Sequence, residues 1–351
     1  MAYQLTPKEL RALKPSFHYI SPELQAMKIF CESCKTHSTP PWNEKCLPLE
    51  VVPAATGGNW VPTGARIPCP ECAAPIHLTL PVVKQTGGYT FYGDEGFRDI
   101  DGKIAITTYS SVGTLNRDIH ILDRKILELK EKFAPQYDPA TWTIHMTKIW
   151  SGQGRKKVPE FQDWDQKKVG NFCDCIFNLI SQYGNTLYVV NSSGVFNLSG
   201  IKAKDIELKN HARNQVYLSL VSHIINTSTA SGVRPQFVFD GEVVRNGTYT
   251  QPWAAEVFEG MKVNLLFPFL AHGIRIDSPK IIVPGSSPGA ELADFICFVV
   301  ARYLFNRISK KTIDLDPRRL GKVSYVGFNE LGNTLGATQH GYPWSYFFNG
   351  K

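Results

Sequence analysis

Apolar and polar residues alternate along this chain with two periods, which predict strands and helices in turn. A period of two predicts strands at residues 89–94 and 103–110, joined by a turn at Asp101-Gly102. A period of about 3.6 predicts an amphipathic helix over residues 116–133. The apolar residues that share one face of this helix are Ile119, Leu122, Ile126, Leu129 and Phe133.

The rest of the chain continues with short apolar runs and longer amphipathic ones. The short runs predict strands at residues 141–146, 187–190, 236–240, 263–267 and 274–277. The longer ones predict helices at residues 166–183, 205–225, 252–260 and 289–306. A hairpin followed by alternating strands and helices implies the α/β class, with a mixed sheet covered by helices on both faces.

Composition is typical of a folded chain, since 43% of the 351 residues are hydrophobic and 20% are charged. This length suits one large domain with an appendage. The formal net charge of +7 permits a nucleic-acid partner without requiring one. Residues 1–13 lack the apolar core of a secretory signal, and no apolar run reaches about 20 residues. We therefore expect no membrane span and a cytoplasmic location.

A cytoplasmic location favours thiols or metal ligands over disulfides for the cysteines. Two Cys-x-x-Cys pairs stand near the amino terminus, Cys31 with Cys34 and Cys69 with Cys72. Two thiolates at this spacing fit one tight turn, and two such turns complete a tetrahedral zinc site. Four thiolates leave no open coordination position, so the sequence predicts a structural zinc ion in a small ribbon.

Other interpretations of these cysteines stay open. Each pair is also compatible with a redox motif or with unrelated buried thiols. Cys46 and His37 are candidate substitute ligands within the same segment. A zinc ribbon of this kind serves nucleic-acid binding, protein binding or the stability of a terminus, and the sequence does not choose among them.

Carboxylates recur at structurally equivalent places in the α/β pattern. Asp94, Asp240 and Asp277 end predicted strands, and Asp294 lies on the last predicted helix. Carboxylates gathered at one edge of a sheet repel one another and lose solvation, so they persist mainly where a cation or a reaction uses them. The alternatives to a functional role are structural: a turn residue at Asp240 and at Asp277, and a charge on the helix surface at Asp294.

Four segments resemble the motifs of one known family. Tyr92-Gly93-Asp94-Glu95-Gly96 is similar to a strand ending in Asp-Glu-Ser-Gly, and residues 144–152 are similar to its histidine segment. Asp240 matches an Asp at a later strand end. Residues 277–278 and 290–294 are similar to Asp-Ser followed by a helix reading Leu-Gln-x-Ala-Asp. Together they resemble the domain-of-unknown-function family numbered 3800, which is RNase H-like and widespread in bacteria, archaea and phages.

The resemblance covers roughly residues 87–307 and departs from the family at two positions. The usual Ser after Glu95 is absent, and Glu291 stands near the usual Gln. The zinc ribbon lies outside the family domain. We therefore expect three parts: residues 1–84 with the ribbon, residues 85–309 with the RNase H-like fold, and a basic and aromatic extension at residues 310–351. The extension is expected to dock onto the domain or a protein partner, with base stacking as the alternative.

The resemblance implies a site. In an RNase H-like fold the first-strand carboxylate lies at the sheet centre, beside one from a neighbouring strand and one from the final helix. This places Asp94, Asp240 and Asp294 together, with Asp277 nearby. Such carboxylates hold two Mg²⁺ or Mn²⁺ ions about 3.5 to 4 Å apart, with Asp94 bridging them.

Two further residues complete the expected chemistry. His145 is expected to orient or protonate the leaving group, and Lys148 to contact a phosphate. Glu95 ranks lower because alternation along the strand turns it to the opposite face of the sheet. The expected function is a metal-dependent nuclease or related phosphoryl-transfer enzyme acting on nucleic acid. The alternative is a catalytically silent adaptor that uses the zinc ribbon, in a mobile-element or anti-phage system.

Overall fold

The computed structural model describes residues 28–38, 49–53, 60–79, 83–197, 206–243, 249–250, 253–262 and 267–326. The chain forms two compact units, each assembled from segments that are distant in sequence. Unit 1 contains Met1–Gly88, Val221–Gln236 and Trp253–Pro279, and unit 2 contains Tyr89–Leu220, Phe237–Pro252 and Lys280–Lys351. The three parts expected from the sequence are each one contiguous stretch of chain, so their bounds differ from those of the two units. Cys46 and residues 327–351 lie outside the described residues.

The centre of the fold is a six-stranded mixed sheet in the order β12-β9-β6-β7-β8-β13. Its first three strands in the chain are antiparallel neighbours: β6 (Gly87–Ile100), β7 (Ile104–Leu115) and β8 (Leu187–Asn197). The remaining strands run parallel to a neighbour, β12 (Lys280–Ile282) to β9 (Val233–Asp240) and β13 (Val323–Val326) to β8. The predicted α/β class with a mixed sheet is confirmed.

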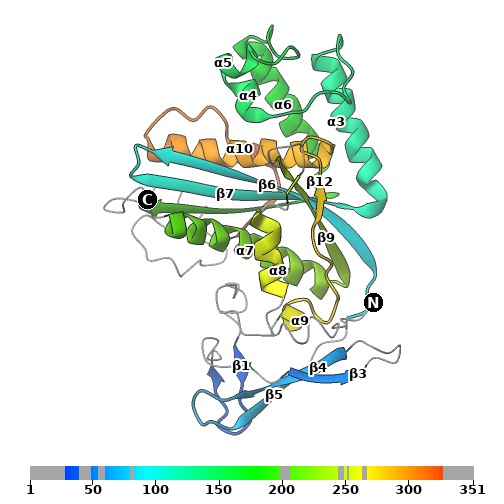
Figure 1. Ribbon diagram of the computed structural model, residues 1–351, viewed down its shortest axis with the longest axis vertical. Helices are drawn as coiled ribbons and strands as arrows, with labels where there is room; N and C mark the ends of the chain where they lie inside the picture. The colour runs from blue at the N-terminus through cyan, green and yellow to red at the C-terminus, as the bar shows by residue number, and fades with distance from the viewer. Residues whose placement is uncertain are drawn as a thin grey trace. The chain divides into compact units, whose positions relative to one another are not determined.

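Helices cover both faces of this sheet (Figure 1). Neighbouring residues of β7 point to opposite faces. Thr108 lies under α10 (Pro288–Ile308), where its carbonyl accepts from Cys297 Sγ, while the ring of Tyr109 meets Tyr217 of α7 (Ile206–Ala230) on the other face. In unit 2, α10 and α7 therefore flank the sheet from opposite sides.

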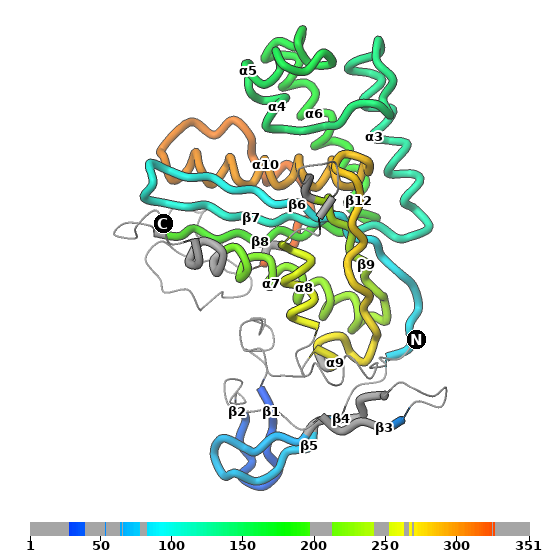
Figure 2. The backbone as a smooth tube through the Cα atoms, in the orientation of Figure 1, coloured from blue at the N-terminus to red at the C-terminus, as the bar shows by residue number. Residues whose placement is uncertain are grey.

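A helical insert follows the β6–β7 hairpin and precedes β8 (Figure 2). It contains α3 (Ile119–Phe133), α4 (Met146–Trp150), α5 (Gly152–Arg155) and α6 (Gln166–Gln182), with a 3₁₀ turn at Asn116–Asp118 before α3. The insert packs on α10 through one continuous apolar core, which includes Ile126, Phe172 and Phe295. Helix α10 is thus buried on two sides, and nearly all of its residues from 289 to 301 are buried.

Unit 1 contains short elements. The hairpin β1 (Ile29–Phe30) with β2 (His37–Ser38) and the sheet of β3 (Leu49–Pro53), β4 (Trp60–Pro68) and β5 (Pro75–Thr79) are antiparallel. The unit also holds α8 (Trp253–Lys262) and α9 (Phe267–Leu270). A further pair, β10 (Glu242–Val243) with β11 (Tyr249–Thr250), belongs to unit 2. Within the described part of the chain, no helix combines the length and apolar character needed to span a bilayer.

Two predicted strands are wrong. Residues 141–146 form no strand, although burial alternates through Trp142, Ile144 and Met146. Instead of pairing with a strand, Ile144 N–H and Met146 N–H donate to the side chains of Glu291 and Asp294. Residues 274–277 form only an isolated bridge at Ile274, and the strand comes later as β12. Of the strand expected at residues 263–267, only Phe267 is described, and it begins α9.

Candidate functional site

The four cysteines come together through two matching turns. In the first, Cys31 N–H donates to Thr36 O at 2.9 Å and Lys35 N–H donates to Cys31 O at 2.8 Å. In the second, Cys69 N–H donates to Ala74 O at 2.8 Å, and Ala73 N–H donates to Cys69 O at 2.9 Å. Lys35 and Ala73 occupy equivalent places and share a positive φ, 58° and 59°. The two turns therefore have the same backbone design.

The sulfur atoms of Cys31, Cys34, Cys69 and Cys72 all lie within 4.8 Å of one another. Cys31 Sγ lies 3.6 Å from Cys72 Sγ, and Cys34 Sγ lies 3.7 Å from Cys69 Sγ. A tetrahedral zinc ion with bonds of about 2.3 Å would hold its sulfur atoms roughly 3.8 Å apart. The backbone N–H of Cys34 lowers the pKa of Cys31 to about 6. At Cys72 the backbone N–H of Ala74 is outweighed by burial and the neighbouring thiols, which raise the pKa of Cys72 to about 12, so the cluster favours a thiolate at Cys31 first. The cluster could bind a metal such as zinc.

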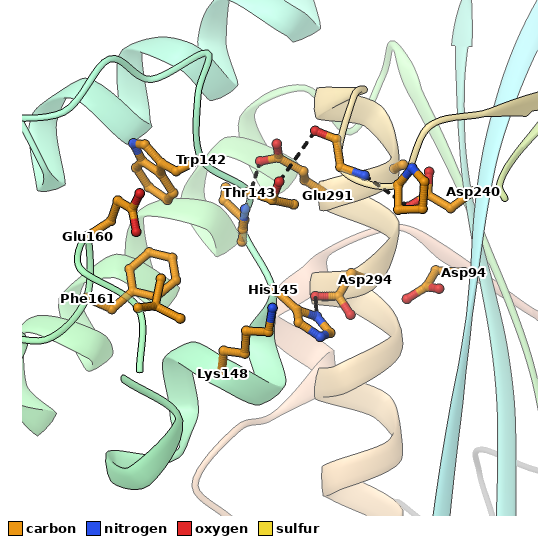
Figure 3. A pocket seen from close by; sticks show the side chains of 15 residues that line it. Asp94, Trp142, Thr143, His145, Lys148, Glu160, Phe161, Asp240, Glu291 and Asp294 are labelled. Carbon is orange, nitrogen blue, oxygen red and sulfur yellow. Dashed lines mark hydrogen bonds and ion pairs between the residues drawn. The ribbon is translucent and has the colours of Figure 1, made fainter. Parts of the chain in front are cut away.

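A second candidate site is a cavity of about 460 Å³ in unit 2 (Figure 3). Five of the predicted site residues line it, and they come from four segments: Asp94 from β6, Asp240 from the end of β9, Asp294 from α10, and His145 and Lys148 at α4. The structure thus brings together residues that are as distant in sequence as Asp94 and Asp294.

Asp94 is held close to α10. A Cβ atom at Gly96, two residues further along β6, would lie 3.0 Å from Thr108 Cγ2 and 3.1 Å from Cys297 Sγ. Glycine at this position therefore lets the helix approach the strand beside Asp94. Desolvation, and next the nearby carboxylate of Asp294, raise the pKa of Asp94 well above its usual range. Two carboxylates in this arrangement favour a shared proton or a bound cation.

Asp294 connects α10 to the start of α4. Its Oδ2 accepts a 2.7 Å hydrogen bond from Met146 N–H and lies 3.6 Å from His145 Nδ1. The other ring nitrogen of His145, Nε2, lies 3.2 Å from Thr147 Oγ1. Asp294 therefore fixes the segment that carries His145, and 45% of the His145 side chain stays exposed.

Asp240 has a carboxylate oxygen that none of the described residues contacts by a hydrogen bond. Its Oδ2 accepts a weak hydrogen bond from Gly285 N–H at 3.4 Å. Its Oδ1 is buried and has no hydrogen-bond partner within the described residues. Burial raises the pKa of Asp240. A buried oxygen without a partner requires an explanation, and a bound cation supplies one.

A buried ion pair, Lys130 with Glu291, supports this cavity and was missed by the sequence reasoning. Lys130 Nζ lies 2.9 Å from Glu291 Oε1, and each side chain is only 2% exposed. Lys130 also donates to the carbonyl of Trp142, and Glu291 Oε2 accepts from Ile144 N–H at 3.2 Å. Burial raises the pKa of Glu291, and Lys130 opposes that effect. The pair thus anchors the chain just before His145.

One sequence signal could have revealed the pair. Lys130 lies four residues after Ile126 and three before Phe133, within the apolar stripe of α3. A lysine inside a buried stripe requires an acceptor, because an unpaired ammonium is costly to desolvate.

Two predicted residues do not line the cavity. Asp277 belongs to unit 1, where it is ion-paired with Arg234 and its side chain is 56% exposed. Asp277, which the sequence grouped with the other carboxylates, is thus not among the residues that line the cavity. Glu95 is exposed and, next to Asp94 in β6, points to the other face of the sheet.

A scan against protein-family models and a search of curated proteins both found no match for this chain.

Proposed function

We propose that the protein is a divalent-metal-dependent nuclease, or a related phosphoryl-transfer enzyme acting on nucleic acid. One observation carries this proposal: Asp94, Asp240 and Asp294 line one cavity, and the described residues leave two of them, Asp94 and Asp240, incompletely compensated. Asp240 Oδ1 lacks a hydrogen-bond partner within the described residues, and the carboxylate of Asp294 raises the pKa of Asp94. Oxygen donors of this kind fit Mg²⁺ or Mn²⁺.

The architecture supports the RNase H-like part of the proposal. β6 is an interior strand of the sheet, β9 is its neighbour, and α10 is the last α-helix among the described residues. Their carboxylates, Asp94, Asp240 and Asp294, are compatible with the arrangement that the resemblance to the family numbered 3800 implies, and this supports the proposal. The same order of elements would be expected of a member of that family.

In this proposal each residue has a role. Asp94, Asp240 and Asp294 would hold the metal ions, and these would stabilise negative charge on the oxygens of a phosphodiester. Asp294 also orients His145, whose exposed ring holds a proton near the leaving oxygen. The exposed ammonium group of Lys148 attracts the phosphate chain. The Lys130–Glu291 pair keeps the His145 segment against α10.

We further propose that the cysteine cluster holds a structural zinc ion in a ribbon. The paired turns and the sulfur separations support this assignment. No cysteine among the described residues forms a disulfide, which suits a reducing compartment and the proposed cytoplasmic location.

An adaptor that binds nucleic acid or protein through the ribbon is the second candidate. The four cysteines are a group of potential ligands whose sulfur atoms lie within 4.8 Å of one another, which supports a metal-bound ribbon. The adaptor predicts binding that survives loss of the carboxylates and fails when Cys31 or Cys69 is replaced.

Cleavage of end-labelled single- and double-stranded DNA and RNA tests the nuclease proposal. Wild type, Asp94→Asn and Asp163→Asn are compared in EDTA, Mg²⁺ and Mn²⁺, since Asp163 is exposed and outside the cavity. We expect metal-dependent cleavage by wild type and Asp163→Asn, and a loss of at least about a hundredfold in Asp94→Asn. Equal cleavage by all three proteins, or none by any, contradicts the proposal.

A further inference from the structure

Arg98 carries a positive charge that no ion pair among the described residues neutralises. It lies four residues beyond Asp94 on β6, so both side chains emerge on the face covered by α10. Its side chain is half-buried, with the guanidinium 5.2 Å from the ring centroid of Phe298. Across the described residues, Arg98 has neither a hydrogen-bond acceptor nor an ion-pair partner. Five N–H donors and a permanent charge make this arrangement costly without an anion.

A second arginine adds to that cost. Arg302 lies close enough to Arg98 that, after burial itself, its charge is the main cause lowering the pKa of Arg98. Arg302 has a carboxylate of its own, because its Nε lies 2.9 Å and 3.0 Å from the two carboxylate oxygens of Asp314. Its guanidinium also covers the ring of Trp150 at 4.6 Å. Asp314 is thus paired with Arg302, whereas Arg98 has no ion pair among the described residues. The charges of Cys297 and Asp294 only partly offset the effects of burial and of Arg302 on the pKa of Arg98.

These residues form an arginine–aromatic cluster, defined as Arg98, Trp150, Phe298 and Arg302. On α10, positions 294, 298 and 302 are spaced by four residues and share one side of the helix. The arginine–aromatic cluster therefore lies next to the carboxylates on both elements: beyond Asp94 on β6 and beyond Asp294 on α10. Asp294 and Phe298 are about 6 Å apart along the helix axis, and Asp94 and Arg98 about 13 Å apart along the strand.

We propose that Arg98 binds a backbone phosphate of a nucleic-acid strand whose neighbouring phosphodiester lies at the carboxylate cavity. This inference rests on the proposed function and names a subsite for it. The planar guanidinium fork suits two phosphate oxygens. The ring of Phe298 lies against the guanidinium, so the donors of Arg98 are oriented before substrate arrives. Positive charge beside aromatic rings is the usual composition of a groove that binds single-stranded nucleic acid.

Binding without cleavage tests the subsite. Fluorescence anisotropy in EDTA measures the affinity for labelled single-stranded DNA and RNA of about 12 nucleotides, at salt from about 50 to 300 mM. The variants are Arg98→Met, which keeps the apolar stem over Phe298, and Arg98→Lys, which keeps the charge. Arg124→Met is the matched control, because Arg124 is an exposed arginine on α3 that faces Glu128. Thermal unfolding of each variant establishes that it is folded.

For Arg98→Met we expect about a five- to twentyfold weaker affinity at low salt and a salt slope less steep by about 0.7. Arg98→Lys is expected to keep the slope and lose part of the affinity, and Arg124→Met to match wild type. An Arg98→Met protein that binds like Arg124→Met overturns the subsite, even if the wild type cleaves. Arg98-dependent binding by a wild type that does not cleave keeps the subsite and removes the nuclease. A wild type that binds neither probe overturns both.

Discussion

The four-cysteine cluster of unit 1 and the carboxylate cavity of unit 2 both collect potential metal ligands, but from different lengths of chain. The cysteines belong to two local turns with the same hydrogen bonds, and their sulfur atoms lie within 4.8 Å of one another. The carboxylates come from a hairpin strand, a later strand and the last described α-helix. Local turns therefore determine the geometry of the cysteine cluster. The carboxylate cavity forms only when the sheet and α10 have assembled.

The two sites also differ in what they leave open. Four thiolates would fill the coordination sphere of zinc, so a metal there can only stabilise the fold. The carboxylates face a cavity of about 460 Å³, and within the described part of the chain Asp240 Oδ1 has no hydrogen-bond partner. A metal there would have positions for substrate. This difference predicts that loss of a cysteine ligand unfolds the segment around the cysteine cluster. Loss of a carboxylate in the cavity should instead reduce activity and leave the fold intact.

The largest effect is expected from breaking the cysteine cluster. Cys69→Ser, or a strong chelator, should release zinc and unfold the segment around residues 60–79. Structural zinc contributes roughly 10–16 kcal/mol to folding in small zinc peptides, far more than a short hairpin provides alone. Zinc content by mass spectrometry and hydrogen exchange of that segment measure the effect.

The matched control is Cys175→Ser, because Cys175 lies on α6 outside the cluster. It should keep both zinc content and exchange protection. A Cys69→Ser protein with full zinc occupancy and unchanged exchange contradicts the assignment.

The next largest effect concerns the buried pair behind the cavity. Lys130→Met leaves Glu291 without its cation, and removing one partner of a buried pair costs about 3–5 kcal/mol. Lys125→Met on the same helix breaks an exposed pair with Glu128 and should cost less than about 1 kcal/mol. Urea unfolding compares the two variants. The double variant Lys130→Met/Glu291→Leu should recover most of the loss, and similar values for Lys130→Met and Lys125→Met would refute the role of the pair.

A smaller, pH-dependent effect is expected at Asp94. Its pKa is raised in the folded protein, so the protonated form favours folding. The stability that this bound proton contributes is fully present below the ordinary pKa of about 3.9. It is lost as pH rises through the higher folded-state pKa of Asp94. Asp94→Asn, which mimics the protonated form, should therefore be more stable than wild type at pH 7 but not at pH 3.

The size of that gain follows from the linkage relation. About 1.4 kcal/mol is expected for each unit by which the folded-state pKa exceeds the ordinary one. Urea unfolding across pH measures it, with Asp163→Asn as a control for loss of one exposed carboxylate. Mn²⁺ should stabilise wild type more than Asp94→Asn. A stability difference that is independent of pH would show that Asp94 is not perturbed by its surroundings.

The smallest effect is expected at Asp277, which the sequence placed near the other carboxylates. Asp277→Asn removes an ion pair whose carboxylate is exposed and whose arginine is mostly buried, so stability should fall by about 1 kcal/mol. Metal-dependent cleavage should not change. A loss of cleavage comparable with that of Asp94→Asn would return Asp277 to the site.

Local patterns predicted the framework of the fold. Alternation gave the hairpin, with the turn at Asp101-Gly102 placed correctly although both strands extend further than expected. Helical spacing gave the helices over residues 116–133 and 166–183 almost to their ends. These elements are determined by neighbouring residues, so a single sequence contains their signal.

The errors arose where the partner is distant in sequence. Residues 141–146 alternate like a strand, but their N–H groups are satisfied by Glu291 and Asp294 of α10. Asp277 follows an apolar run like the other carboxylates, yet its partner is Arg234. No local pattern distinguishes a carboxylate that pairs with arginine from one that faces a cavity.

Anomalous diffraction from Mn²⁺-soaked crystals tests the central claim most directly, because it locates the metal without relying on a chosen substrate. We predict a peak in the cavity within coordination distance of the Asp94 and Asp294 carboxylates, and no such peak in Asp94→Asn crystals soaked in the same way. Wild-type crystals in saturating Mn²⁺ with no peak at these carboxylates would contradict the metal-dependent site.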